Sequence, residues 1–412
     1  MIKTKYGTRP THNILKSIEI LLLAFIIIYT SGYAMSTVET SIGAYVLIIP
    51  TFIMLVILLV KQKVFLKIDI FTFSYLILCL MVIVSFIVNF NFPYFSTNIK
   101  TLLILTFAFC LARLIKFEDF IKYFTLSMKC IVIISLIIYI WINYLNLPFN
   151  LPVVYNINGA AYYNGIFFFV FVFSTLRNTG VFWEPGLFAS FIIISMIFEI
   201  SFKKNISYFN LLILFLGLLS TQSTAGYFFL PMILLLLLNK NAKFGRSYFF
   251  SALFIIIALL AYINMGNILH YLWTLNPDVF GKIINQEGSY VDRLDSPITN
   301  LSIFLSYPIF GAGIGNINYI YGGLTDIYQT STSTYFLAAF GFWGVLYTLF
   351  WVYGIMKLRN QNNLSKIIII SIFLMILNKE PHTSIVVTYC IMFFFLKEAF
   401  ISKSNNLTGS IK

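Results

Sequence analysis

The sequence predicts an all-α polytopic membrane protein, and three observations lead to that class. The chain has 412 residues, of which 60% are hydrophobic and only 10% are charged. Soluble domains are about 45–50% apolar, so this composition excludes a soluble fold. Apolar segments of roughly the length that a bilayer-spanning helix needs recur along the chain. Basic residues gather in alternate loops, as they do in multi-pass membrane proteins.

Twelve segments are candidate spans, and an even number places both termini on one side. They are residues 14–31, 42–60, 69–89, 99–115, 126–146, 185–201, 208–221, 225–239, 247–265, 333–355, 365–378 and 383–397. Residues 165–176 are also apolar, but a run of about twelve residues is too short to cross a bilayer. We interpret them as a re-entrant or interfacial piece of an outer loop.

The distribution of basic residues orients these spans. Of the 27 lysines and arginines, 22 fall on the side of the termini, which the positive-inside rule identifies as cytoplasmic. The other five lie outside: Lys100, Arg177, Lys282, Arg293 and Lys379. The net charge of +13 is therefore mainly a topology signal, and it does not indicate nucleic-acid binding. We predict a multi-pass membrane protein with both termini in the cytoplasm.

Two long outer loops, 146–184 and 266–332, are predicted to form an outward-facing site within a single membrane domain that covers residues 1–412. The second loop joins spans nine and ten and carries the most polar stretch of the chain. Long loops in compact proteins are usually functional or disordered. The four cysteines show no C-x-x-C spacing and there are only three histidines, so neither a metal site nor a disulfide framework is indicated.

Two outer arginines, Arg177 and Arg293, are not explained by topology. Guanidinium groups bind phosphate bidentately and keep their charge, so an outer pocket with both suits an anionic group such as a lipid-linked diphosphate. The alternative for Arg293 is a local ion pair with Asp292 or Asp295. Arg177 has no acidic neighbour in the sequence before Glu184.

Two Glu-Pro pairs open predicted helices on the outer side. Glu184 precedes Pro185, where it could serve as a helix cap or as a general base. Glu380 stands in the charged turn NKEPHT with Lys379 and His382. His382 could be a surface residue or a catalytic one, and Glu380 is a further candidate base.

Polar and aromatic side chains near these charges are candidate sugar ligands. The turn STQSTAG offers Thr221, Gln222 and Ser223, although a self-capped helical hairpin would also use such residues. Trp183 is a candidate for stacking on a sugar ring, and Lys379 for binding substrate. The sequence alone does not choose among the other outer tyrosines and tryptophans.

The order of these features resembles the bacterial O-antigen and capsular polysaccharide polymerases (Wzy-type), within the wider group that includes O-antigen ligases. The shared features are an RxxGxFxEPGxxA pattern at Arg177–Ala189, the TQSTAG hairpin, and an arginine followed by a P-x-x-G-x-G-x-G segment at Pro308–Gly315. The resemblance covers roughly residues 170–355. Ligases carry a His-Asn pair where this chain has Thr332 and Ser333, which favours a polymerase.

The resemblance implies a GT-C-like, metal-independent membrane glycosyltransferase with no cofactor. Such enzymes join a glycan on polyprenyl diphosphate to a new lipid-linked repeat unit, with arginines on the diphosphates. Implied partners are the polyprenyl-diphosphate-linked oligosaccharide, membrane lipid, a flippase and chain-length regulator proteins, with no nucleic acid. The alternatives are a ligase-type glycan transferase and a lipid-linked oligosaccharide flippase. A flippase would be expected to carry polar groups mid-span, whereas here they gather at one face.

Overall fold

Apolar helices make up most of the structure, which is a computed structural model. It describes residues 28, 42–60, 69–145, 151–155, 161–165, 168–172, 176–240, 271, 274, 289–326, 328–358 and 361–409. Five helical stretches in that part of the chain are long and apolar enough to cross a membrane: Phe71–Val88, Phe92–Leu114, Phe117–Asn143, Pro185–Phe202 and Thr332–Met356. The chain is thus a mostly helical protein with the character of a membrane protein.

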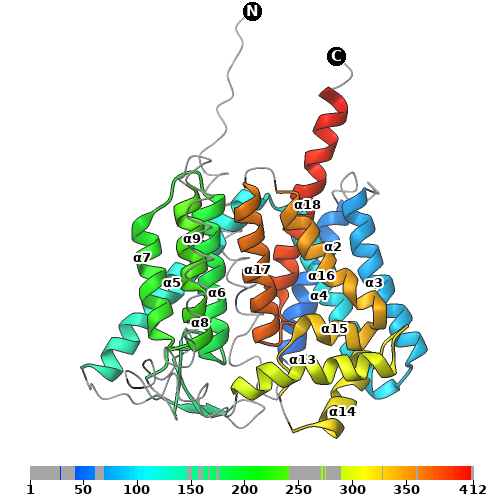
Figure 1. The fold of residues 1–412 in the computed structure, drawn as a ribbon, viewed down its shortest axis with the longest axis horizontal. Coiled ribbons are helices and arrows are strands. Elements are labelled where there is room, and N and C mark those ends of the chain that lie inside the picture. The colour runs from blue at the N-terminus through cyan, green and yellow to red at the C-terminus, as the bar shows by residue number, and fades with distance from the viewer. Residues whose placement is uncertain are drawn as a thin grey trace, which may run out of the picture.

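Most of the helices form a bundle whose axes run roughly parallel, while α13 lies across one end of it (Figure 1). The first group is α2 (Ile42–Val60), α3 (Ile70–Val88), η2 (Phe92–Tyr94), α4 (Phe95–Leu114) and α5 (Phe117–Asn143). The second is α6 (Pro185–Ile197), η3 (Phe198–Phe202), α7 (Tyr208–Ser220), α8 (Thr224–Phe228) and α9 (Leu230–Lys240). The third is α13 (Ser289–Ser306), α14 (Ile314–Leu324), α15 (Thr332–Phe340), η4 (Gly341–Gly344), α16 (Val345–Met356), α17 (Asn363–Lys379) and α18 (Val386–Gly409).

Ten of the twelve predicted spans fall on these helices, but two of the ten are interrupted. Segment 225–239 is divided between α8 and α9, because Pro231 has no N–H with which to continue the helix from α8. Segment 333–355 is broken by the 3-10 turn Gly341–Gly344. Segments 14–31 and 247–265 lie outside the described residues, apart from Ile28. A count of twelve crossings therefore stays a prediction.

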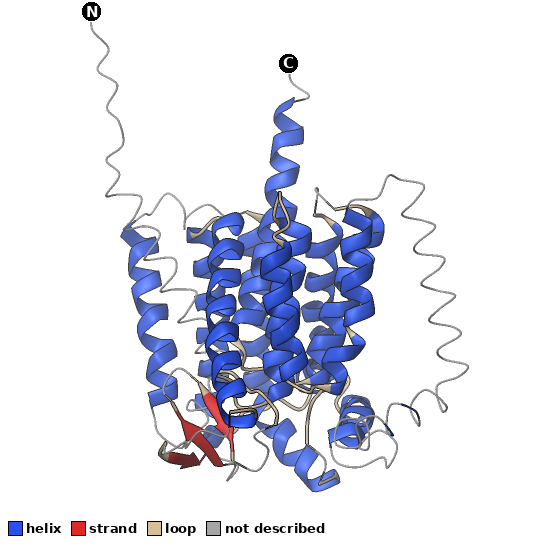
Figure 2. Cartoon of the chain, turned by 90° about the vertical axis from the view of Figure 1, so that its left-hand side faces the viewer, coloured by secondary structure: helices blue, strands red, loops and turns tan. Residues whose placement is uncertain are grey.

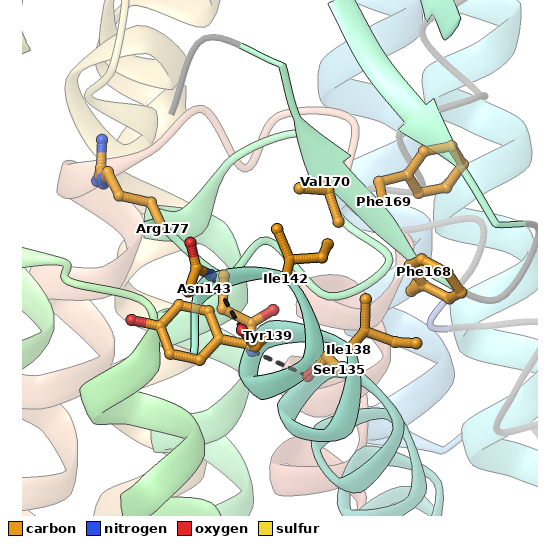
Figure 3. A pocket seen from close by; sticks show the side chains of 10 residues that line it. Ser135, Ile138, Tyr139, Ile142, Asn143, Phe168, Phe169, Val170 and Arg177 are labelled. Atoms are coloured by element: carbon orange, nitrogen blue, oxygen red, sulfur yellow. Dashed lines mark hydrogen bonds between the residues drawn. The ribbon is translucent and has the colours of Figure 1, made fainter. Parts of the chain in front are cut away.

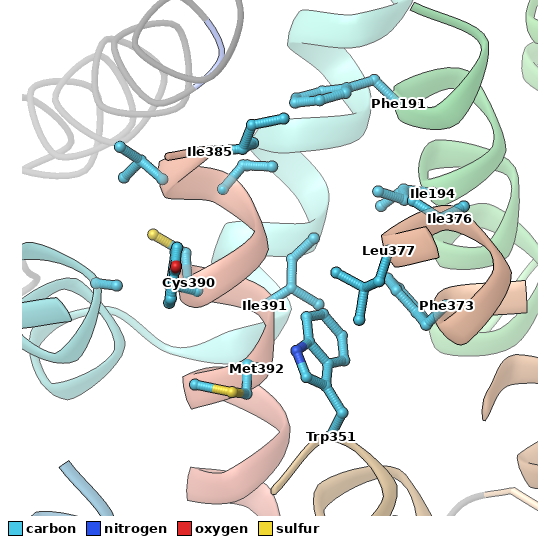
Figure 4. Close-up of a cluster of buried hydrophobic side chains, with 14 of the residues drawn as sticks. Phe191, Ile194, Trp351, Phe373, Ile376, Leu377, Ile385, Cys390, Ile391 and Met392 are labelled. Atoms are coloured by element: carbon cyan, nitrogen blue, oxygen red, sulfur yellow. The ribbon is translucent and has the colours of Figure 1, made fainter. Parts of the chain in front are cut away.

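Helix α6 lies at the centre of its half of the bundle. All 13 of its residues are buried, and a helix that is apolar on every side belongs inside a larger assembly of helices. Its residues Phe191 and Ile194 face Phe373, Ile376 and Leu377 of α17, while Trp351 and the first half of α18 complete the cluster (Figure 4). This packing fixes the position of the first turn of α6.

The two ends of the bundle differ in their polar contacts. At one end Lys240 donates to the carbonyls of Ile200 and Lys203, and Lys397 donates to those of Ala112 and Ile115. At the other end lie the start of α6, the α7–α8 turn, the end of α17 and the horizontal helix α13; we call it the lower end, as drawn (Figure 1). The C-terminal part of α18 projects from the opposite, upper end.

A small antiparallel sheet at the lower end was not predicted, and it corrects the strictly all-α description. Strands β1 (Val153–Tyr155), β2 (Ala161–Asn164) and β3 (Phe169–Phe171) pair in that order (Figure 2). Strand β3 lies within the apolar run 165–176, which had been interpreted as re-entrant or interfacial. The aromatic side chains of that run suit a half-buried strand, and Tyr162 and Phe169 form a small core.

The described part of the second outer loop is helical. Helix α13 crosses the lower end of the bundle and α14 follows below it (Figure 1). The turn between them requires glycine: Gly311 has φ +70°, and a Cβ there would lie 2.3 Å from the backbone of Ala339. The Gly-rich segment thus joins the loop to α15 by close backbone packing.

Candidate functional site

The loop before α6 is fixed by the asparagine that follows Arg177. The Asn178 side-chain amide donates to the hydroxyls of Ser135 on α5 and Ser220 on α7, at 3.1 and 2.9 Å. Its side-chain oxygen accepts from the Gly180 N–H at 3.0 Å. These contacts tie Arg177 to two helices, so a residue of a predicted outer loop gains a fixed position. Nothing in the sequence distinguished Asn178 for this role.

Glu184 stands at the N-cap position of α6, but its side chain does not cap the helix. Pro185 occupies the first helical position, as predicted. The carboxylate instead reaches toward Arg293, with Oε1 3.9 Å from Nη2. Glu184 is therefore the N-cap residue, as one interpretation expected, but its side chain makes no capping hydrogen bond and is directed into the site.

Arg293 joins three elements at the lower end. Its Nη2 lies 2.9 Å from Oε1 of Glu380, and its Nε donates to the carbonyl of Lys379 at 3.1 Å. The suggested pairing with a neighbouring aspartate is not found; Asp292 accepts instead from the Tyr328 N–H at 3.2 Å. Arg293 thereby connects α13 to the turn after α17 and to Glu184 before α6.

The two glutamates meet over Gly186, in the first turn of α6. A Cβ at Gly186 would lie 2.5 Å from Oε1 of Glu380 and 3.4 Å from Oε1 of Glu184. Only a residue without a side chain leaves room for both carboxyl groups. Glu380 is 4% exposed and Glu184 is 35% exposed, so the pair has one inner and one outer member.

Lys379 lies beneath this pair, buried at the end of α17. Its Nζ donates to the carbonyl of Gly186 at 3.0 Å and to Oγ of Ser223 at 3.3 Å. It therefore holds the first turn of α6 against the N-cap of α8. Lys379 is predicted from the sequence to bind substrate. Only 5% of Lys379 is exposed, so its contacts support the site from within.

Arg177 completes what we call the charged cluster: Arg177, Glu184, Arg293, Lys379 and Glu380. It interacts electrostatically with Glu184, Arg293 and Glu380, yet it forms no hydrogen bond or salt bridge with the described residues. Its Nε is buried without a partner. Other buried atoms of the described chain also lack a partner, Nε2 of His382 among them, but Arg177 is the one that belongs to the charged cluster, where an anionic ligand could pair with it.

Burial alters the ionisation of the inner members. It raises the pKa of Glu380 above its ordinary value, with a further contribution from neighbouring Glu184. It lowers the pKa of Lys379, and it lowers that of Arg177 against the opposing effect of Glu184. The lower end thus concentrates groups whose protonation is perturbed by burial and by charged neighbours, as functional sites commonly do.

The remaining predicted residues fall into two groups. His382 and Thr221 are fully buried and bond internally, His382 through Nδ1 to Thr388 at 3.1 Å and Thr221 through Oγ1 to Leu218 at 2.7 Å. His382 is therefore not at an accessible surface of the site. Gln222 and Trp183 are partly exposed, and Trp183 packs against the core of the sheet.

Two cavities bear on the site. A small one is lined by Arg177, Tyr139, Asn143 and Phe168 among others (Figure 3), and its volume of about 10 Å³ suits a single water molecule. A larger one of about 370 Å³ lies between α3, η4 and α16, with apolar walls that include Leu80 and Trp343. None of the charged cluster lines the larger cavity, so it is not the place for an anionic group.

Within the described ranges no group of three His, Cys, Asp or Glu side chains is arranged to hold a metal ion. No family model, curated protein or solved structure matches this chain. A function for this chain must therefore be inferred from the charged cluster itself. Three of the five basic residues predicted to lie outside belong to it; Lys100 is exposed on α4, and Lys282 lies outside the described residues.

Proposed function

We propose that this chain is a polysaccharide repeat-unit polymerase of the bacterial cytoplasmic membrane. It would transfer a growing glycan from polyprenyl diphosphate to a sugar hydroxyl of a new lipid-linked repeat unit at the outer face. The observation that carries the proposal is the half-buried guanidinium of Arg177, which lies beside Arg293 at one end of an apolar bundle and has no hydrogen-bond partner among the described residues. An anionic substrate with a long apolar tail suits that combination.

The arginines would stabilise the leaving group. In the transfer, the bond between the anomeric carbon and the phosphate oxygen breaks, and its electron pair passes to the diphosphate. Arg177 would meet that charge, because its buried Nε has no partner and the positive end of α6 begins nearby at Pro185. Arg293, which already pairs with Glu380, supplies a second positive charge.

Glu184 is the best-placed general base. The acceptor hydroxyl must lose a proton as its oxygen bonds to the anomeric carbon, and the base must be accessible. Glu184 is 35% exposed and its nearest cationic nitrogen, on Arg293, is 3.9 Å away. Glu380 is 4% exposed and tightly paired, and His382 is fully buried. In this proposal Glu380 positions Arg293, and His382 takes no direct part.

The proposal is tested by replacing Arg177 and Arg293 singly with Ala and Lys, and by measuring polymer length on gels. We expect both Ala variants to lose long chains and to accumulate single repeat units outside the cytoplasmic membrane. Lys100→Ala, which removes another predicted outer cation, is the matched control and should make normal polymer. Long chains in both Ala variants would contradict the assigned site.

The same experiment separates the alternatives. Repeat units that stay on the cytoplasmic leaflet in the Ala variants would favour a flippase. Normal chain length without attachment of the chains to their final acceptor would favour a ligase-type transferase, since the two enzymes share a donor and differ in acceptor.

A further inference from the structure

A group of uncharged polar and aromatic side chains lies beside Arg177. Tyr139 is near the end of α5, Gln222 is in the turn between α7 and α8, and Tyr227 is in α8. All three are partly exposed. We call these three residues the tyrosine–glutamine wall. The sequence could not single out these tyrosines, because the chain has 26 of them.

The three residues lie close to one another and to the charged cluster. The Tyr139 hydroxyl lies next to the Gln222 side chain, and the Tyr227 hydroxyl donates to the Leu219 carbonyl at 2.9 Å. Tyr139 and Arg177 line the same small pocket (Figure 3). Tyr227 interacts electrostatically with both Arg177 and Tyr139. The wall is therefore next to the guanidinium of Arg177.

The backbone of Gln222 is strained. Its φ is +46°, and it is the one non-glycine residue with positive φ in the part of the chain that the structure describes. Such a conformation persists only where the surroundings impose it, and it often marks a functional position. The next residue, Ser223, caps α8, and the Gln222 side chain lies next to Tyr139.

We propose that Tyr139, Gln222 and Tyr227 bind the first sugar of the donor glycan, the sugar attached to the diphosphate that Arg177 holds. This inference depends on the proposed function and specifies its donor subsite. Tyrosine offers a sugar ring both an apolar face and a hydroxyl, and the glutamine amide both donates and accepts hydrogen bonds. No ionisable acid or base other than the tyrosines belongs to the wall, so it suits an uncharged sugar.

The position of the wall determines which sugar it contacts. Because Tyr139 and Arg177 line the same pocket, a sugar on the wall would be the one next to a diphosphate held by Arg177. The pocket beneath Tyr139 holds only about 10 Å³, so the sugar lies over the wall and not inside the bundle. The bond between the anomeric carbon and the phosphate oxygen would then lie between the wall and the arginines. Glu184, the proposed base for the acceptor hydroxyl, would lie on the other side of that bond.

The test compares two ligands of the purified full-length protein in detergent. One is sugar-free polyprenyl diphosphate, and the other is the lipid-linked repeat unit isolated from cells that lack this chain. Gln222→Gly removes the amide and accepts the positive φ without strain, and Tyr139→Phe removes one hydroxyl. We expect each variant to raise the Kd for the repeat unit about 5- to 10-fold, as the loss of one hydrogen bond would. The Kd for sugar-free polyprenyl diphosphate should not change.

Controls separate this inference from the proposed function. Tyr319→Phe changes an exposed residue of α14 and should leave both affinities unchanged. Arg177→Ala should weaken the binding of both ligands. If the wall variants raised the Kd of both ligands equally, or of neither, the sugar subsite would be overturned while the proposed function would stand. Failure of the unaltered protein to bind polyprenyl diphosphate would overturn the proposed function, and the subsite with it.

Discussion

Gly186→Ala is the substitution whose consequence follows most directly from the geometry. The new Cβ would lie 2.5 Å from Oε1 of Glu380, while ordinary contact begins at 3.4 Å. Oε1 of Glu380 would have to move by the difference of about 0.9 Å, and a shift away from Arg293 would lengthen their 2.9 Å contact beyond hydrogen-bonding distance. A charge-assisted hydrogen bond contributes about 1.5–3 kcal/mol, so polymerisation should fall about 10- to 150-fold.

The assay is the rate of chain growth by purified variants in proteoliposomes supplied with lipid-linked repeat units. Gly322→Ala is the matched control, because nothing lies within 4 Å of the Cβ it adds, and it should retain full activity. Thermal unfolding is measured in parallel, since alanine also favours the helix by up to about 1 kcal/mol. Chain growth by Gly186→Ala at the unaltered rate would refute the paired arrangement of the two carboxyl groups.

Three other substitutions test separate parts of the site. Arg177→Lys keeps the charge but not the planar guanidinium, so its rate of chain growth should be about tenfold below that of the unaltered protein and above that of Arg177→Ala. A Lys variant as fast as the unaltered protein would contradict bidentate binding. Burial raises the pKa of Glu380 above its ordinary value of 4.5, so the folded protein keeps a proton at pH values where the unfolded chain releases it. Thermal stability should thus fall as the pH rises above about 5, and Glu380→Gln should make stability depend less on pH; the same pH dependence in this variant would contradict the assignment. Lys379→Met leaves the Gly186 carbonyl and Ser223 hydroxyl without their donor and should lower stability by about 1–3 kcal/mol; an unchanged melting temperature would contradict this.

Much of the site was predictable because charge is rare in this chain. Arg177, Arg293 and Lys379 were selected as basic residues on the outer side, and the structure brings all three together with Glu184 and Glu380. Hydropathy predicted the helical segments because an apolar segment in a membrane must pair its own backbone polar groups, which a helix does. The identification of helices was more reliable than that of their ends.

What the sequence did not predict depends on side-chain direction. Glu184 occupies an N-cap position, and only the structure shows that its carboxylate turns to Arg293 instead. Exposure of His382 could not be inferred either, because a turn between helices can be covered by its neighbours. The short strands were missed because β3 has only three residues and its aromatic composition is equally typical of a membrane segment.

Helix continuity was a further limit. Pro231 interrupts an apolar run that hydropathy treats as one segment, and the effect of a proline on a helix depends on which neighbours re-satisfy the backbone. Gly186 stands in the Glu-Pro-Gly sequence, but its importance depends on Glu380, which is distant in the chain. Contacts between such distant residues are invisible to local patterns.

The most direct test of the proposed function is reconstitution with purified components. The protein is placed in proteoliposomes with one homogeneous lipid-linked repeat unit, a metal chelator and no nucleotide sugar, and the products are separated on a gel. The proposal predicts a ladder of polymer lengths and release of polyprenyl diphosphate, both lost in Arg177→Ala. Single repeat units alone from the unaltered protein, with no release of polyprenyl diphosphate, would contradict it.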